Sequence, residues 1–312
     1  LALRALSLVL GLAAFPFLFA LARRTGGRGA VVPVGLFLAL SPPAVYYGTE
    51  GRMYSLLWLS VLAFAWATVR LRARPGPELL AVFGASALAG FLTHYFFLFV
   101  FAPLCAWLLW RPGRAARARV LLVLALVLLG LLPWYLELPR SLAAWRVTGE
   151  WLTWEPYGFR RGTAALELFL GFLTGGARDL WGEHERAATL ALTTFALLCV
   201  TWLVRTRARG FAGAPLVLVL WLAGALAGPL VFDLVRGTYT VAVPRYAAAG
   251  LPAALLLAGV LLARLPRAWR FGFVGLILLA WSPNLERMHT RAARSWCPLR
   301  EVRSGGGFHL PI

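Results

Sequence analysis

Three short segments of the sequence place arginine, histidine and tyrosine side chains beside long apolar runs, where they could bind an anion. The first is SPPAVYYGTEGRMYSLL (residues 41–57), which contains Glu50, Arg52 and Tyr54. A guanidinium group there suits a phosphate, because its planar donors bind two oxygens at once and it stays protonated. An arginine at a membrane interface also reaches lipid headgroups in many proteins. The spacing alone therefore leaves both roles open for Arg52.

The second segment, THYFFLF (residues 93–99), places His94 and Tyr95 between two apolar runs. Histidine can donate a hydrogen bond to a phosphate or hydroxyl oxygen in either protonation state. The alternative is that the pair anchors the turn between two helices at the membrane interface, where tyrosine is common. We expect His94 at the apex of a helical hairpin in both cases.

The third segment, VAVPRYAAAGLP (residues 241–252), places Arg245 and Tyr246 directly before another apolar run. A second arginine close to Arg52 would form a clamp for a phosphate or diphosphate group. Alone, an arginine at this position is most often an anchor. Asp233 lies earlier in the same loop, and it could pair with Arg245 or serve as an acid.

Membrane-spanning helices must position these residues, because 61% of the chain is hydrophobic and only 14% is charged. A soluble domain of 312 residues could not bury so much apolar surface. Since one span needs roughly 20 apolar residues, the sequence predicts an all-α bundle of about ten spans. Pro42 and Pro43 should end the helix before them and leave a turn over residues 46–51. The predicted spans are 5–22, 30–46, 53–70, 79–93, 95–110, 120–137, 187–204, 214–232, 247–263 and 269–282.

The arginines predict which side of the membrane each loop faces. All 31 basic residues are arginine, and the net charge is +19. Five short alternate loops carry three or four arginines each, and Glu78 is the acid among them. Short arginine-rich loops stay in the cytoplasm, so the three candidate segments should face outward. Because the positive charges are spread over many loops, the sequence does not favour a nucleic-acid interface.

The remaining outward segments are a long loop over residues 138–186 and a C-terminal tail over residues 283–312. The loop contains AALELFLGFL (residues 164–173), which is apolar but too short to span and therefore suits an interfacial or re-entrant helix. The three cysteines lie far apart and have neither metal-ligand nor disulfide spacing. The chain begins with Leu1, and its first segment reads as a spanning helix rather than a signal peptide.

Together the motifs resemble family 39 of the GT-C glycosyltransferases, the protein-mannosyltransferase-like group that includes bacterial lipid A sugar transferases. The family pattern runs from an RLPS helix to SP…YSQEARMYSLL, a THY hairpin and a later RY…P helix start. This chain has LRALSLVLGLAAFPFLFALARR, SPPAVYYGTEGRMYSLL, LTHYFFLFV and PRYAAAGLPAALLL in the same order. The match covers essentially the whole chain. It departs at Thr49 and Gly51, where the family usually has Gln and Ala.

The resemblance implies a single membrane domain over residues 1–312 that transfers a sugar with inversion from a polyprenyl-phosphate donor. The acceptor would be a hydroxyl of a glycan, lipid or protein at the outer face of the bacterial cytoplasmic membrane, with no metal or cofactor. In the family the catalytic acid lies in the first outer loop, so this chain would lack the first helix and that loop, and its general base is expected upstream of Leu1. The residues implied for phosphate and substrate binding are Arg52, Arg245, His94, Tyr54 and Tyr246, with Glu50, Tyr95 and Asp233 in supporting positions.

Two other functions stay open on the sequence: a transporter or lipid flippase, and a non-catalytic membrane subunit of an envelope assembly system. Transporters typically contain inverted repeats and ionisable residues near the bilayer midplane. The sequence has no clear repeat, and its polar residues gather at the ends of the predicted spans. An acidic pair in a first outer loop would favour the transferase, and its absence would favour the subunit.

Overall fold

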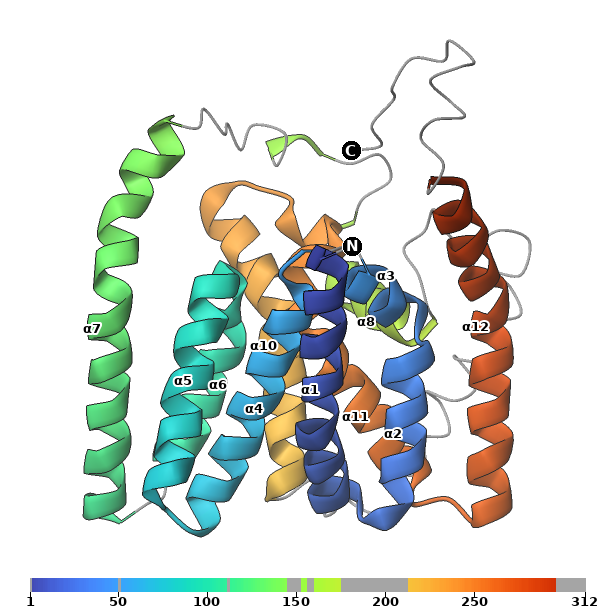
Figure 1. Ribbon diagram of the computed structural model, residues 1–312, viewed down its shortest axis with the longest axis horizontal. Coiled ribbons are helices and arrows are strands. Elements are labelled where there is room, and N and C mark those ends of the chain that lie inside the picture. The colour runs from blue at the N-terminus through green and yellow to red at the C-terminus, as the bar shows by residue number, and fades with distance from the viewer. Residues whose placement is uncertain are drawn as a thin grey trace.

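A computed structural model describes residues 2–49, 52–110, 113–144, 153–155, 160–174 and 213–295. In this part of the chain the protein is a bundle of helices without any strand (Figure 1). Five of the described helices are long and apolar enough to cross a membrane, or six if one bent pair counts as a single span. The predicted all-α fold with helices fit to span a membrane is therefore confirmed, whereas the count of about ten spans and the GT-C arrangement stay predictions.

The first half of the chain is organised around one buried helix, α4 (Tyr54–Ala73), which packs against its neighbours α1, α5 and α6. Its side chains are apolar on all faces, as expected for a helix enclosed by other helices. It is buried along most of its length. The other elements of this half are α1 (Ala2–Gly26), α2 (Arg28–Leu40), α3 (Pro42–Thr49), α5 (Pro77–Thr93), η1 (Tyr95–Phe97), α6 (Leu98–Leu109) and α7 (Arg114–Ala144).

The second half packs onto the first mainly through α10 (Ala214–Arg236), which lies against α6. Gly224 and Gly228 are one turn apart and both face Phe99 of α6, so closely that a Cβ atom at either position would overlap it. Small residues at this spacing let two membrane helices approach each other. The other elements are α8 (Ala164–Thr174), η5 (Thr240–Ala242), η6 (Pro244–Gly250), α11 (Leu251–Leu262) and α12 (Arg267–Ser295).

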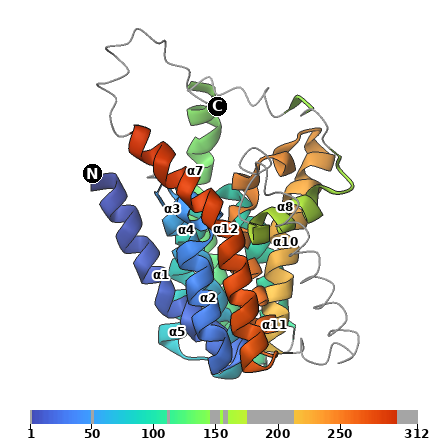
Figure 2. The same ribbon diagram turned by 90° about the vertical axis from the view of Figure 1, so that its right-hand side faces the viewer.

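The two ends of the bundle differ in character. The connections α1–α2, α4–α5, α6–α7 and α11–α12 gather at the lower end in Figure 1, and these are arginine-rich loops of the sequence. At the upper end lie α3, η5 and η6, and α8 lies at the same level across the bundle (Figures 1 and 2). The helix directions thus place four of the five arginine-rich loops at one end, as the alternation predicts, and the fifth, over residues 205–209, lies outside the described residues.

Two arginines at the lower end bind helix carbonyls. Arg72 donates to the carbonyl oxygen of Trp107 at 2.6 Å, and its guanidinium lies 4.0 Å from the centroid of that indole ring. Arg270 donates to the carbonyl oxygen of Ala263 at 2.9 Å and to those of Leu262 and Leu265. Since the last carbonyls of a helix have no partner within it, Arg270 stabilises the C-terminal end of α11.

The side chains of α7 indicate a surface that faces lipid. Val120, Val127 and Leu131 are buried on one narrow face, and α7 packs against α5. Many leucines on its other faces are exposed, and Leu122 and Leu129 are among those more than 60% exposed. An apolar surface of this length is unfavourable in water but is what a spanning helix presents to a bilayer.

The structure differs from the predicted span 30–46, which is broken into α2 and α3 with a bend of 53°. The break lies at Ser41, which is extended (φ −68°, ψ 128°), because a residue before proline avoids the helical conformation. The prediction that Pro42 ends the preceding helix is therefore confirmed. The predicted turn over residues 46–51 is wrong for residues 46–49, because α3, which begins at Pro42, continues to Thr49.

Three further boundaries are now defined. Helix α7 continues to Ala144 and α12 to Ser295, so the loop expected from 138 and the tail expected from 283 begin later than predicted. Both helices continue past the end of the long apolar run into residues of mixed polarity, where hydropathy alone gives no signal. The short helix predicted over 164–173 is observed as α8. The predicted span 187–204 lies outside the described residues.

Candidate functional site

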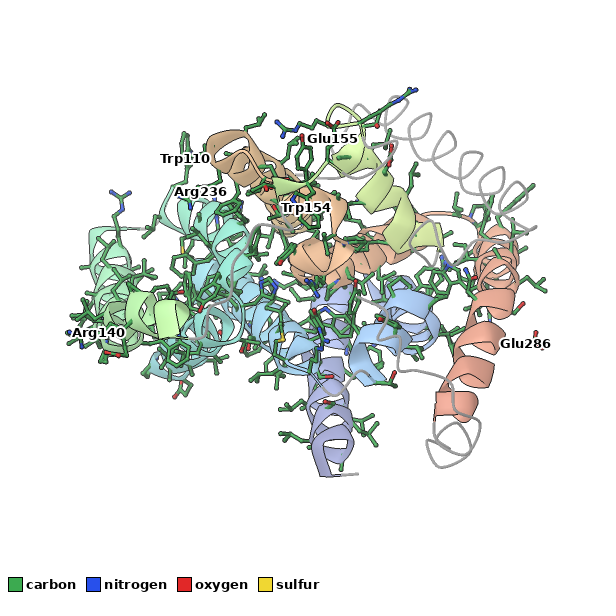
Figure 3. All side chains as sticks on the ribbon, turned by 90° about the horizontal axis from the view of Figure 1, so that it is seen from above. Trp110, Arg140, Trp154, Glu155, Arg236 and Glu286 are labelled. Carbon is green, nitrogen blue, oxygen red and sulfur yellow. The ribbon has the colours of Figure 1, made fainter. Side chains whose placement is uncertain are left out.

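The candidate site lies at the end of the bundle opposite the arginine-rich loops, which Figure 3 shows from above. It is formed where the turn between α5 and α6 meets η6, and these two segments are in contact. They carry His94 and Arg245 respectively. The second and third segments of the sequence analysis are therefore neighbours in the fold.

His94 is held by the turn that it forms. Its backbone is extended (φ −154°, ψ 123°), which ends α5, and its N–H donates to the carbonyl oxygen of Gly90 at 3.0 Å. Its Nδ1 accepts a hydrogen bond of 3.2 Å from the backbone N–H of Phe96, the second residue of η1. Because Nδ1 acts as an acceptor, the neutral ring carries its proton on Nε2. Nε2 is thus a hydrogen-bond donor.

Tyr246 lies against this imidazole, and Arg245 is its neighbour on η6. The rings of His94 and Tyr246 have centroids 6.2 Å apart, and the guanidinium of Arg245 lies 5.3 Å from the Tyr246 ring. Burial lowers the pKa of His94 to about 4, and the positive charge of Arg245 contributes in the same direction. At neutral pH the site therefore combines one permanent cation with one uncharged N–H donor. This combination favours an anionic oxygen ligand.

Two buried tryptophans hold the 3₁₀ helix that carries Arg245. Trp58 of α4 donates from Nε1 to the carbonyl oxygen of Ala248 at 2.9 Å, and Trp221 of α10 donates to that of Ala249 at 2.7 Å. A buried indole N–H requires such a partner. These two residues were not among the predicted site residues. The sequence signal was tryptophan within apolar helices, two in α4 (Trp58 and Trp66) and one in α10, which also fits simple core packing.

Asp233 is fully buried, and its carboxyl group is occupied by the loop that follows α10. Oδ1 accepts hydrogen bonds from Thr238 Oγ1 (2.7 Å), Thr240 N (2.7 Å) and Thr240 Oγ1 (2.5 Å), and Oδ2 accepts one from Val241 N (2.8 Å). The sequence suggested an acid or a partner of Arg245. The contacts instead indicate a residue that organises the loop.

The first segment enters the same end of the bundle through α4. Tyr54 is buried at the start of α4, and its ring lies 4.7 Å from that of Tyr47 in α3. It precedes Trp58 by one helical turn, so it lies on the face of α4 that also carries the indole bound to η6. Arg52 is exposed just before this helix, and Glu50 lies outside the described residues.

Two aromatic residues of the THYFF turn face different neighbours. Tyr95 is 48% exposed and its ring meets Tyr135 of α7 at 6.1 Å, so it lies apart from the ring of Tyr246. Phe96, which the sequence analysis did not single out, lies 5.1 Å from Tyr246 and 5.3 Å from Phe232 of α10. An apolar surface therefore adjoins the cation of Arg245 on the side of α10.

Among the described residues, no three His, Cys, Asp or Glu side chains lie close enough to hold a metal ion. No protein-family model, curated protein or solved structure matches the chain. Its function must therefore be inferred from the motifs and from the contacts around His94 and Arg245.

Proposed function

We propose that this protein is a membrane glycosyltransferase that moves a sugar from a polyprenyl-phosphate donor to an acceptor hydroxyl. The observation that supports this most is the ring of Tyr246, which contacts the uncharged donor His94, the guanidinium of Arg245 and the ring of Phe96. A lipid phosphate needs a cation and N–H donors for its oxygens, and it needs an apolar surface for the first part of its chain.

In this proposal Arg245 binds the donor phosphate, and His94 donates from Nε2 to one of its oxygens. The acceptor hydroxyl attacks the anomeric carbon while a general base takes its proton, and the bond from that carbon to the phosphate oxygen breaks. Negative charge then develops on the departing lipid phosphate, where a fixed cation and a fixed donor stabilise it. No residue of this chain is assigned as the general base.

The distribution of arginines supports an outward-facing site in the cytoplasmic membrane. The arginine-rich loops lie at one end of the bundle and the candidate site at the other, and such loops stay on the cytoplasmic side. A donor with its sugar displayed on the outer face would then meet the site from within the bilayer.

The test compares Arg245→Ala with Arg140→Ala in the full-length gene product, reconstituted in lipid nanodiscs. Arg140 is a matched control, because it is an exposed arginine on α7 that pairs with Glu137. We expect Arg245→Ala to weaken binding of a polyprenyl-phosphate by about 10- to 100-fold, since a charge-assisted contact is lost. We expect sugar transfer to fall at least as far. Equal donor binding and equal transfer in the two variants would contradict the proposal.

A transporter or lipid flippase is the second candidate, and the helix breaks favour it. The 53° bend between α2 and α3 and the 3₁₀ segment η6 before α11 are discontinuous helices, a feature of many secondary transporters. The two functions differ in their products. Transfer yields a new glycosidic bond on an acceptor, whereas transport moves an unchanged lipid across a liposome membrane.

A further inference from the structure

The hydrogen bonds of Asp233 continue along the chain toward Arg245. The carboxyl group accepts hydrogen bonds from the backbone N–H groups of Thr240 and Val241, which are the first two residues of η5. The Thr240 carbonyl oxygen then accepts from Val243 N at 3.0 Å, and the Val243 carbonyl oxygen accepts from Tyr246 N at 3.0 Å. An unbroken series of short bonds thus links a buried carboxyl group to the residue next to Arg245.

The η5–η6 segment is also held by contacts at both of its ends. At its start, Gly237 adopts a left-handed conformation (φ 66°) that turns the chain back from α10 and places Thr238 and Thr240 over the Asp233 side chain. At its end, the indoles of Trp58 and Trp221 bind the consecutive carbonyl oxygens of Ala248 and Ala249. The backbone that carries Arg245 is therefore restrained before and after that residue.

We propose that Asp233 and Thr240 form a buried anchor that holds the η5–η6 segment in place and thereby positions Arg245 where η6 meets the turn of His94. Asp233 is in this view a positioning residue and has no contact of its own with a substrate. The inference concerns the fold around Arg245 and stands whether or not the protein transfers a sugar.

Thr240 is the sharpest position at which to test the anchor. Its hydroxyl group donates to Asp233 Oδ1 and its N–H donates to the same oxygen, so Thr240→Val removes one of these bonds and keeps side-chain size and charge. Thr240→Ser keeps the hydroxyl group and is the matched control. Asp233→Asn is a second variant, in which an amide NH₂ must face an N–H donor of the loop.

His94 can report the position of Arg245, because the guanidinium lowers the pKa of this imidazole. The groups facing His94 from η6 are Arg245 and Tyr246, the contacts from η1 are with Phe96, and Tyr95 is its neighbour in sequence. NMR titration of the full chain, labelled with ¹⁵N in its four histidines, measures this pKa. His94→Asn identifies the signal.

We expect a pKa of about 4 for His94 in the wild type and in Thr240→Ser. It should rise in Thr240→Val and in Arg245→Gln but stay below 6.5, because burial persists. Combining Thr240→Val with Arg245→Gln should give no further rise, since both act through the same guanidinium. In Asp233→Asn it should rise as well, although loss of a negative charge alone would lower it.

Three results would overturn the inference. The first is an unchanged His94 pKa in a folded Thr240→Val protein, and the second is a fall of that pKa in Asp233→Asn. The third is an additive rise in the combined variant, which would mean that Thr240 affects His94 without Arg245. If Thr240→Val does not fold, the inference is tested by whether the His94 pKa rises or falls in Asp233→Asn.

Discussion

At the scale of single residues, the site depends on His94 being uncharged. The imidazole uses Nδ1 to accept from Phe96 N, which fixes both the ring and the start of η1. Burial and the neighbouring Arg245 disfavour a proton on Nδ1. One side chain therefore shapes the turn and presents a donor to the site.

We predict that acid destabilises the protein through His94. Its pKa is about 4 in the folded protein and 6.5 ordinarily, so between these pH values the unfolded chain binds a proton that the folded chain does not. The stability associated with the neutral ring is complete above pH 6.5 and is lost as the pH falls, by at most about 3 kcal/mol. Chemical denaturation in detergent micelles at pH 7, 6 and 5 measures this loss.

The matched variant is His94→Asn, whose Oδ1 can accept the same hydrogen bond from Phe96 N and does not titrate. We expect the wild type to lose more stability than His94→Asn between pH 7 and pH 5. Identical pH dependence of the two proteins would show that His94 binds its proton as readily in the folded protein as in the unfolded one.

At the scale of elements, the contact between α6 and α10 sets the frame for the site. Phe99 of α6 fits against Gly224 and Gly228 of α10, and no larger side chain has room there. This contact lies next to Phe96 and Phe232, whose rings are 5.3 Å apart. Close approach of these two helices therefore brings the THYFF turn to the end of α10.

We predict that Gly228→Ala destabilises the protein although alanine is the better helix former. A Cβ atom at this position overlaps Phe99, and overpacking of this kind costs about 1–3 kcal/mol. Gly272→Ala on α12 is the control, because nothing lies near its Cβ position, and this variant should gain up to about 1 kcal/mol. Thermal denaturation in detergent compares the two. Equal melting temperatures would mean that α6 and α10 do not pack this closely.

At the scale of the whole molecule, the bundle is polarised by charge. Its lower end in Figure 1 carries exposed arginines such as Arg24, Arg74 and Arg267, and Glu78 is the acid described there. The opposite end carries the buried Asp233 and the candidate site. Membrane proteins with this asymmetry insert so that the arginine-rich end faces the cytoplasm.

We predict the orientation from single cysteines introduced at the two ends, after the three native cysteines have been replaced. In intact spheroplasts a membrane-impermeant maleimide should label Arg236→Cys, which lies at the candidate-site end. It should label Arg267→Cys, at the other end, only after the membrane is permeabilised. The reverse pattern would place the candidate site in the cytoplasm.

How much of the fold could be predicted from the sequence depended on whether a signal was local. The breaks at Ser41 and His94 were readable, because proline and polar residues interrupt apolar runs there. The helical continuations to Thr49, Ala144 and Ser295 were not, since polar residues can extend a helix beyond the apolar part of a span. The roles of Trp58 and Trp221 were equally hidden, because the partners of their N–H groups are backbone carbonyl oxygens on η6.

The sequence by itself determined that this chain forms apolar helices joined at alternate turns by arginine-rich loops, because apolar length and loop charge are properties of contiguous residues. It also singled out Arg245, His94 and Asp233 as residues out of place in an apolar chain. Only the tertiary structure decided that η6, which carries Arg245, meets the turn of His94, and that Asp233 holds Thr240. These contacts depend on how α6 and α10 pack and on how the chain turns at Gly237, and no stretch of residues encodes such geometry alone.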